Sequence, residues 1–150
     1  MGKIDLEKSS GIKEKLVGSW KLVDYHRIMA TGDKIYPWGK AVDGRLTYTP
    51  DGQLSVQQMK LDRTAFASGD GWNGTSAEIE EAFKGYLAYC GRYELHEEDG
   101  AVHHIIECCL LPHWVGLTLL RYYQFTDNRL TLTSAPIHDA SIFNLTWERF

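Results

Sequence analysis

Gly18-Ser19-Trp20 stands at the head of the first apolar strand, and Trp147-Glu148-Arg149-Phe150 closes the chain. A tryptophan therefore opens the first strand, two residues after a glycine, and an arginine ends the last strand. A guanidinium group can lie flat against an indole face in a cation–π contact. Trp20 and Arg149 are therefore candidates for such a contact between the first strand and the last.

Length and composition limit the possible classes of protein. The 150 residues suffice for one domain with one hydrophobic core. Hydrophobic residues make up 43% and charged residues 24%, as in ordinary soluble globular proteins. The net charge of -4 and the lack of a basic stripe argue against nucleic-acid binding. No apolar run is long enough to span a membrane, and residues 1–15 contain no signal-peptide core. We expect a cytoplasmic protein.

The cysteines and histidines give no sign of a metal site or a cofactor. The three cysteines, Cys90, Cys108 and Cys109, are odd in number and lack the spacing of a disulfide framework. The chain has neither a Cys-x-x-Cys nor a His-x-x-x-His motif. We therefore expect no structural disulfide, no bound metal and no cofactor.

Alternating hydrophobicity and turn signals predict an all-β fold with one helix. The eight expected strands cover residues 20–28, 44–49, 53–59, 91–96, 102–109, 117–125, 129–134 and 141–150. Thr75 and Glu78 form a capping box that begins a short helix over 76–88. Residues 1–15 form a lead-in with one helical turn near 12–16, and 16–150 form the single domain. Short antiparallel connections predict an eight-stranded up-and-down barrel, which can hold one small ligand.

Several motifs resemble those of the small bacterial and fungal lipocalin-like domain family, which belongs to the calycin group. They include Leu16-Val17-Gly18-Ser19-Trp20, Tyr36-Pro37-Trp38-Gly39, the 44–52 hairpin, Phe83-Lys84-Gly85-Tyr86, Pro112-His113-Trp114-Val115-Gly116 and Trp147-Glu148-Arg149. The resemblance covers nearly the whole chain and implies a lipocalin-like barrel with a cavity and no bound metal. Related domains include cofactor-free enzymes that act on polyketide- or terpenoid-like intermediates, so the resemblance implies such chemistry by analogy.

Strand alternation indicates which side chains face the interior. Asp24 and His26 share the face of Trp20, and on another strand His104 shares the face of two apolar residues. An inward Arg121 needs a carboxylate, a carbonyl or an anionic ligand, and Asp24 and Glu107 are the nearest partners by pattern. The candidate catalytic residues are His104, Arg121, Tyr93 and Tyr123. The candidate ligand-binding residues are His26, Tyr48, Trp38, Trp114 and Phe125.

These residues favour a cofactor-independent enzyme, such as an isomerase, cyclase, dehydratase or pericyclase, acting on a hydrophobic biosynthetic intermediate. Histidine can act as a general acid or base near neutral pH, while arginine and tyrosine can stabilise an enolate. The same side chains are also compatible with a structural hydrogen-bond network. One alternative function is a non-catalytic carrier of a small apolar or anionic molecule. Another is a haem-binding barrel that uses His104. Both a monomer and a homodimer are compatible with the sequence.

Overall fold

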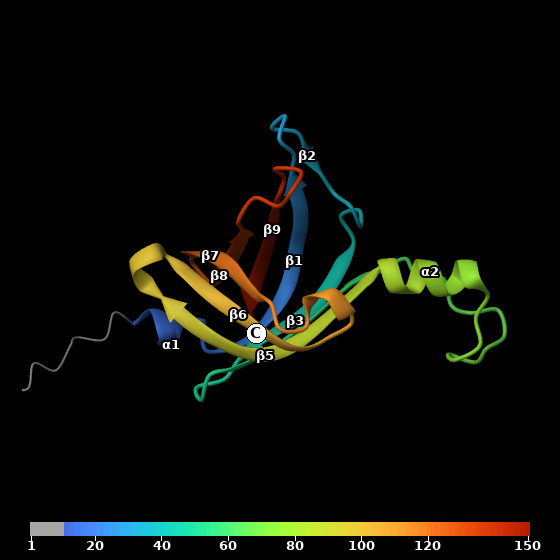
Figure 1. The fold of residues 1–150 in the computed structure, drawn as a ribbon, viewed down its shortest axis with the longest axis horizontal. Helices are drawn as coiled ribbons and strands as arrows, with labels where there is room; N and C mark the ends of the chain where they lie inside the picture. The colour runs from blue at the N-terminus through green and yellow to red at the C-terminus, as the bar shows by residue number, and fades with distance from the viewer. Residues whose placement is uncertain (1–10) are drawn as a thin grey trace, which may run out of the picture.

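Eight long antiparallel strands pair in sequence order, and the last strand closes onto the first (Figure 1). The computed structural model describes residues 11–150, so most of the predicted lead-in lies outside the described residues. The barrel strands are β1 (Gly18–Ile28), β3 (Val42–Tyr48), β4 (Gln53–Lys60), β5 (Tyr86–His96), β6 (Ala101–Cys109), β7 (Thr118–Thr126), β8 (Arg129–Ser134) and β9 (Ile142–Arg149). The short strand β2 (Lys34–Ile35) pairs with the end of β1. The predicted eight-stranded antiparallel barrel is confirmed.

Four short helical segments accompany the barrel. They are α1 (Ile12–Leu16), α2 (Ser76–Lys84), η1 (Glu97–Asp99) and η2 (Pro112–Trp114). The predicted capping box begins α2. The Thr75 hydroxyl accepts a hydrogen bond from the Glu78 backbone N–H, and the Glu78 carboxylate accepts one from the Thr75 backbone N–H. Figure 1 shows α2 and the preceding loop projecting away from the barrel. None of the helices in residues 11–150 is long and apolar enough to cross a bilayer.

The boundary between α2 and β5 differs from the prediction. The helix ends at Lys84 rather than at 88, and β5 begins at Tyr86 rather than at 91. Residues 86–92 pair with β4, and Tyr86 lies opposite Met59. An apolar segment of this kind satisfies helical and strand periodicity equally well, so pairing with β4 decides its conformation.

The floor of the barrel has the expected arrangement. The guanidinium carbon of Arg149 lies 4.0 Å from the Trp20 ring centroid, and Arg149 donates to the Val17 carbonyl at 2.6 Å. Gly18 has a φ of 129°, and a Cβ there would collide with the Arg149 guanidinium. Both the left-handed backbone and the close approach require glycine at position 18. The Trp20 indole donates to the Leu16 carbonyl at 2.9 Å, which ties α1 to the floor.

A β-bulge in β1 overturns the inward placement of Asp24 and His26. Leu22 lies opposite Trp147, but the register shifts before Asp24, so that Tyr25 lies opposite Leu145. One extra residue in a strand moves the side chains that follow it to the opposite face of the sheet. Tyr25 consequently faces the interior, while His26 pairs with Asp24 on the other face, with Nδ1 and Oδ2 2.5 Å apart.

Candidate functional site

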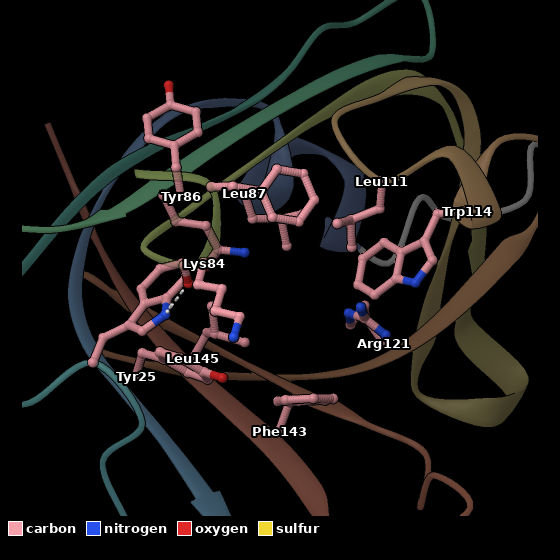
Figure 2. Close-up of a pocket in the computed structure, with 12 residues that line it drawn as sticks. Tyr25, Lys84, Tyr86, Leu87, Leu111, Trp114, Arg121, Phe143 and Leu145 are labelled. Carbon is pink, nitrogen blue, oxygen red and sulfur yellow. Dashed lines mark hydrogen bonds between the residues drawn. The ribbon is translucent and has the colours of Figure 1, made fainter. Parts of the chain in front are cut away.

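A cavity of about 270 Å³ lies in the barrel, and Trp20 is not among its lining residues. Figure 2 shows side chains of this lining. Most of its wall is aromatic or aliphatic, and three lining side chains are polar. It is lined by Tyr25, Trp38, Gln58, Phe83, Lys84, Tyr86, Leu87, Leu111, Trp114, Arg121, Phe143 and Leu145. Concave apolar surfaces with a few convergent polar groups are typical of small-molecule sites.

Tyr25 and Trp38 form one aromatic side of the cavity. Their ring centroids are 5.2 Å apart in an edge-to-face arrangement. The Trp38 indole donates to the Lys84 carbonyl at 2.9 Å, as Figure 2 shows, and this bond connects the 36–39 loop to the end of α2. Burial raises the pKa of Tyr25 to about 12, although the Arg27 charge opposes the rise. The Tyr25 hydroxyl therefore keeps its proton at neutral pH.

Arg121 is the central cation of the site. Figure 2 shows Arg121 and Trp114 across the cavity from Tyr25 and Lys84. Arg121 Nη1 donates to the carbonyl of its neighbour Leu120 at 3.0 Å. Within residues 11–150 no carboxylate forms an ion pair with Arg121.

The two partners that the sequence suggested for Arg121 are therefore wrong. Asp24 pairs with His26, and Glu107 accepts from Arg92 at 2.7 Å on the outer surface. A half-buried guanidinium keeps its proton, so its remaining donors are suited to an anionic or carbonyl group.

His104 lies beneath the cavity, bonded on both sides. Its Nε2 is 2.6 Å from the Tyr48 hydroxyl, and its Nδ1 is 2.8 Å from the Tyr89 hydroxyl. The side chain is only 1% exposed. Burial, followed by the charges of Arg121 and His103, holds the pKa of His104 well below its ordinary value. His104 is therefore neutral at pH 7, with one ring nitrogen donating and the other accepting.

The two tyrosines differ in their surroundings. Burial raises the pKa of Tyr48 well above its ordinary value. Burial also raises the pKa of Tyr89, but the charge and hydrogen bonding of Arg121 oppose that rise. Because His104 is the only partner found for the Tyr48 hydroxyl in residues 11–150, we infer that Tyr48 donates to Nε2. Nδ1 then donates to Tyr89, which retains its own proton for another acceptor.

A second, smaller chamber of about 20 Å³ continues the cavity inward. It shares Gln58, Arg121 and Leu145 with the larger cavity. Its lining is completed by Leu46, Val56, Tyr89, His104, Leu132 and Trp147. The site is therefore an aromatic cavity that adjoins a small chamber with polar groups, and Arg121 lines both.

The family model described as a lipocalin-like domain matches residues 17–150. The chain belongs to the lipocalin-like domain family. A lipocalin-like protein from Bacteroides uniformis ATCC 8492 is similar, with 14% identity, a TM-score of 0.46, and coverage of 91% of this chain and 99% of that one. The wild-type fluorescent protein UnaG has 13% identity, a TM-score of 0.42, and coverage of 91% and 98%. Among curated proteins, none matches this chain.

The lipocalin-like barrel brings some of the predicted residues together. Arg121, Trp38 and Trp114 line the larger cavity. His104 lines the inner chamber, and Tyr48 is its hydrogen-bond partner. These five residues come from separate strands and loops, and closure of the barrel places them around one interior.

Four other predicted residues do not line either space. Tyr93 donates to the Thr49 carbonyl at 2.5 Å, and Phe125 packs near Trp20, with ring centroids 6.4 Å apart. Tyr123 packs against Phe125 and lies with it toward the floor. His26 is directed elsewhere by the bulge in β1. The inward faces extend along the whole barrel, so facing inward does not by itself place a residue at the cavity.

Sequence reasoning missed several lining residues. Gln58 continues the inward alternation of Leu54 and Val56, and this signal was present in the sequence. Tyr25 was hidden by the bulge, and Tyr89 by its place between the expected helix over 76–88 and the expected strand from 91. Lys84 lies at the end of α2, and no local pattern indicates that this end of the helix borders the cavity.

Proposed function

We propose that this lipocalin-like protein binds a small, largely apolar molecule whose anionic or carbonyl group meets Arg121. The position of Arg121 supports the proposal most strongly, because the guanidinium lies at the inner end of an aromatic cavity and has no carboxylate partner in residues 11–150. The volume lies near the lower end of the roughly 300–1,000 Å³ range of ligand pockets. A compact polyketide- or terpenoid-like molecule fits these requirements.

The fluorescent probe anilinonaphthalene sulfonate, which is apolar and anionic, tests this function. We expect saturable binding to the wild type and about tenfold or weaker binding to Arg121→Gln, because one charged hydrogen-bonding partner is lost. Arg92→Gln is the matched control, since Arg92 lies on the outer surface and pairs with Glu107. Equal affinity of the two variants would show that Arg121 does not receive the anion.

Native mass spectrometry of gently purified protein provides a second test. A retained small molecule is expected to leave on denaturing extraction and to contain an anionic or carbonyl group. Retention of a hydrocarbon without such a group would contradict the role of Arg121.

Cofactor-free catalysis is the second candidate function, and the Tyr48–His104–Tyr89 chain favours it. Tyr89 can donate a proton to a substrate oxygen near Arg121, and the Nδ1–H of His104 then stabilises the Tyr89 oxygen until water returns a proton to it. His104 then acts through Tyr89 rather than on the substrate. The expected reactions are isomerisations or cyclisations that pass through an enol. The haem alternative fits poorly, because both nitrogens of His104 are engaged by tyrosines.

Deuterium exchange into the ketone tetralone tests this second function. Protonation of the carbonyl oxygen by Tyr89 and loss of the adjacent carbon-bound proton to water would give the enol, whose return in heavy water incorporates deuterium. We expect the wild type to accelerate exchange, and Tyr89→Phe to lose the acceleration while still binding tetralone. Tyr122→Phe, on the exposed face of β7, serves as the control. Undiminished exchange in Tyr89→Phe would contradict this mechanism.

A further inference from the structure

Two buried polar atoms beside the inner chamber lack hydrogen-bond partners in the part of the chain that the structure describes. They are Gln58 Oε1 and Trp147 Nε1. Both side chains line the chamber, and their exposed fractions are 7% and 2%. A buried polar atom without a partner is costly and rare in folded proteins. Two such atoms around one space indicate that a hydrogen-bonding group is received there.

The donors and acceptors around the chamber limit what that group can be. Arg121 and Trp147 can only donate hydrogen bonds and the Tyr89 hydroxyl also has a proton to donate, whereas the Gln58 carbonyl oxygen can only accept hydrogen bonds. A hydroxyl oxygen can accept two hydrogen bonds and donate one, which matches this set. A carbonyl or carboxylate oxygen has no proton to give to Gln58, so it would leave that acceptor unsatisfied.

The volume of the chamber also fits a single hydroxyl group. Its volume is about 20 Å³, and a single water-sized group requires roughly 10–15 Å³ on this kind of measure. Because the chamber shares Gln58, Arg121 and Leu145 with the larger cavity, a molecule held there can extend one substituent inward.

We propose that the inner chamber is a subsite for one hydroxyl group, alcoholic, phenolic or enolic, of the molecule bound in the larger cavity. The Gln58 carbonyl oxygen accepts a hydrogen bond from this hydroxyl, while Arg121 and Trp147 donate hydrogen bonds to the hydroxyl oxygen. Gln58 is therefore a specificity-determining residue. This inference rests on the proposed binding function and adds the chemical class of the ligand. A water molecule has the same hydrogen-bonding capacity, so the test must distinguish a ligand hydroxyl from water.

Calorimetric titration with three matched probes makes this distinction. The probes are 2-naphthol, 2-methoxynaphthalene and naphthalene, used at neutral pH, where the naphthol keeps its proton. We expect the wild type to bind 2-naphthol about tenfold more tightly than either of the others, because only the naphthol satisfies Gln58. If water occupies the chamber when ligand is bound, the naphthol has no such advantage.

The variant Gln58→Met tests the assigned residue, because methionine has a similar length and no carbonyl acceptor. We expect the preference for 2-naphthol to fall to about twofold or less, while naphthalene binds as before. Gln53→Met, on the same strand but exposed, is the control. Thermal unfolding of each variant verifies folding, and the comparison of probes on the wild type decides the proposal even if Gln58→Met does not fold.

The outcomes separate this inference from the function on which it rests. Equal affinity of the wild type for all three probes overturns the hydroxyl subsite and leaves binding in the larger cavity intact. A preference that persists in folded Gln58→Met overturns the role of Gln58 and therefore the subsite as proposed. A failure of all three probes to bind overturns the subsite alone if anilinonaphthalene sulfonate still binds, and overturns the proposed binding function as well if that probe also fails.

Discussion

The guanidinium carbon of Arg149 lies 4.0 Å from the centroid of the Trp20 ring, at the floor of the barrel. The same guanidinium donates to the carbonyls of Val17 and Lys15. These contacts join the last strand to the first strand and to the segment before it. These contacts close one end of the barrel. The cavity lies toward the opposite end, where a ligand can enter.

Replacing Arg149 with lysine should destabilise the floor. Lysine keeps the charge but lacks the planar group that covers the indole and donates to two carbonyls at once. We expect Arg149→Lys to lower the free energy of unfolding by about 1–3 kcal/mol, measured by urea denaturation. Arg129→Lys is the control, because Arg129 pairs with Glu148 at the surface and should change stability by less than about 1 kcal/mol. Similar losses in both variants would contradict the role of the floor contact.

Gly18→Ala should disturb the same floor through the backbone. Its φ of 129° is unfavourable for alanine, and the added methyl group would meet the Arg149 guanidinium. We expect a loss of about 1–3 kcal/mol in the free energy of unfolding, together with altered tryptophan fluorescence. Gly71→Ala is the control, because no atom lies within 4 Å of the corresponding Cβ position. A Gly18→Ala variant as stable as the wild type would show that neither the backbone conformation nor the contact with Arg149 requires glycine here.

The pH dependence of stability should report the buried state of His104. Its pKa in the folded protein lies well below the ordinary 6.5, because of burial and then the charges of Arg121 and His103. The unfolded chain therefore binds more protons in the interval between the two pKa values. The His104 contribution is fully present above pH 6.5 and is lost as the pH falls toward the folded pKa.

The variant His104→Gln isolates this contribution, since glutamine can bond both tyrosines but does not titrate. We expect the wild type to lose up to about 1.4 kcal/mol per pH unit more than the variant below pH 6.5. Denaturant titrations at several pH values give the two slopes. Equal slopes would mean that His104 takes up a proton in the folded protein as readily as in the unfolded chain.

Trp38→Phe should loosen the rim of the cavity. Phenylalanine keeps an aromatic ring beside Tyr25 but cannot donate to the Lys84 carbonyl. We expect faster amide hydrogen exchange at the end of α2 and faster dissociation of anilinonaphthalene sulfonate, by about tenfold or less. Trp72→Phe is the matched control, because Trp72 is 98% exposed. Unchanged exchange in Trp38→Phe would show that this bond does not hold the rim.

Some features were predictable because they depend on neighbouring residues. The capping box at Thr75 requires only a suitable side chain at each of two positions. The alternation around Leu54 favours an inward apolar face for the expected 53–59 strand, and the burial of Leu54 and Val56 agrees with it. The strand boundary at Tyr86 was not predictable in this way, because the same apolar segment suits a helix until β4 pairs with it.

The site was harder to predict than the barrel. The bulge in β1 moves Tyr25 inward and His26 outward. The alternation of apolar and polar residues in the sequence gives no sign of one inserted residue. A second irregularity, between Cys90 and Gly91, adjoins Tyr89 on β5. Bulges depend on how the partner strand is aligned, so their effect on a side chain's direction appears only after pairing.

The sequence by itself determined the eight strands and the helix start, because these follow from alternation and capping, and its resemblance to a known family indicated the glycine, tryptophan and arginine of the floor. Only the tertiary structure decided the surroundings of His104 and Arg121. The partners of His104 lie 56 and 15 residues away along the chain, on β3 and β5. Such distant groups meet only when the barrel closes, and burial then lowers the pKa of His104. Closure also places Arg121 in the lining of the cavity.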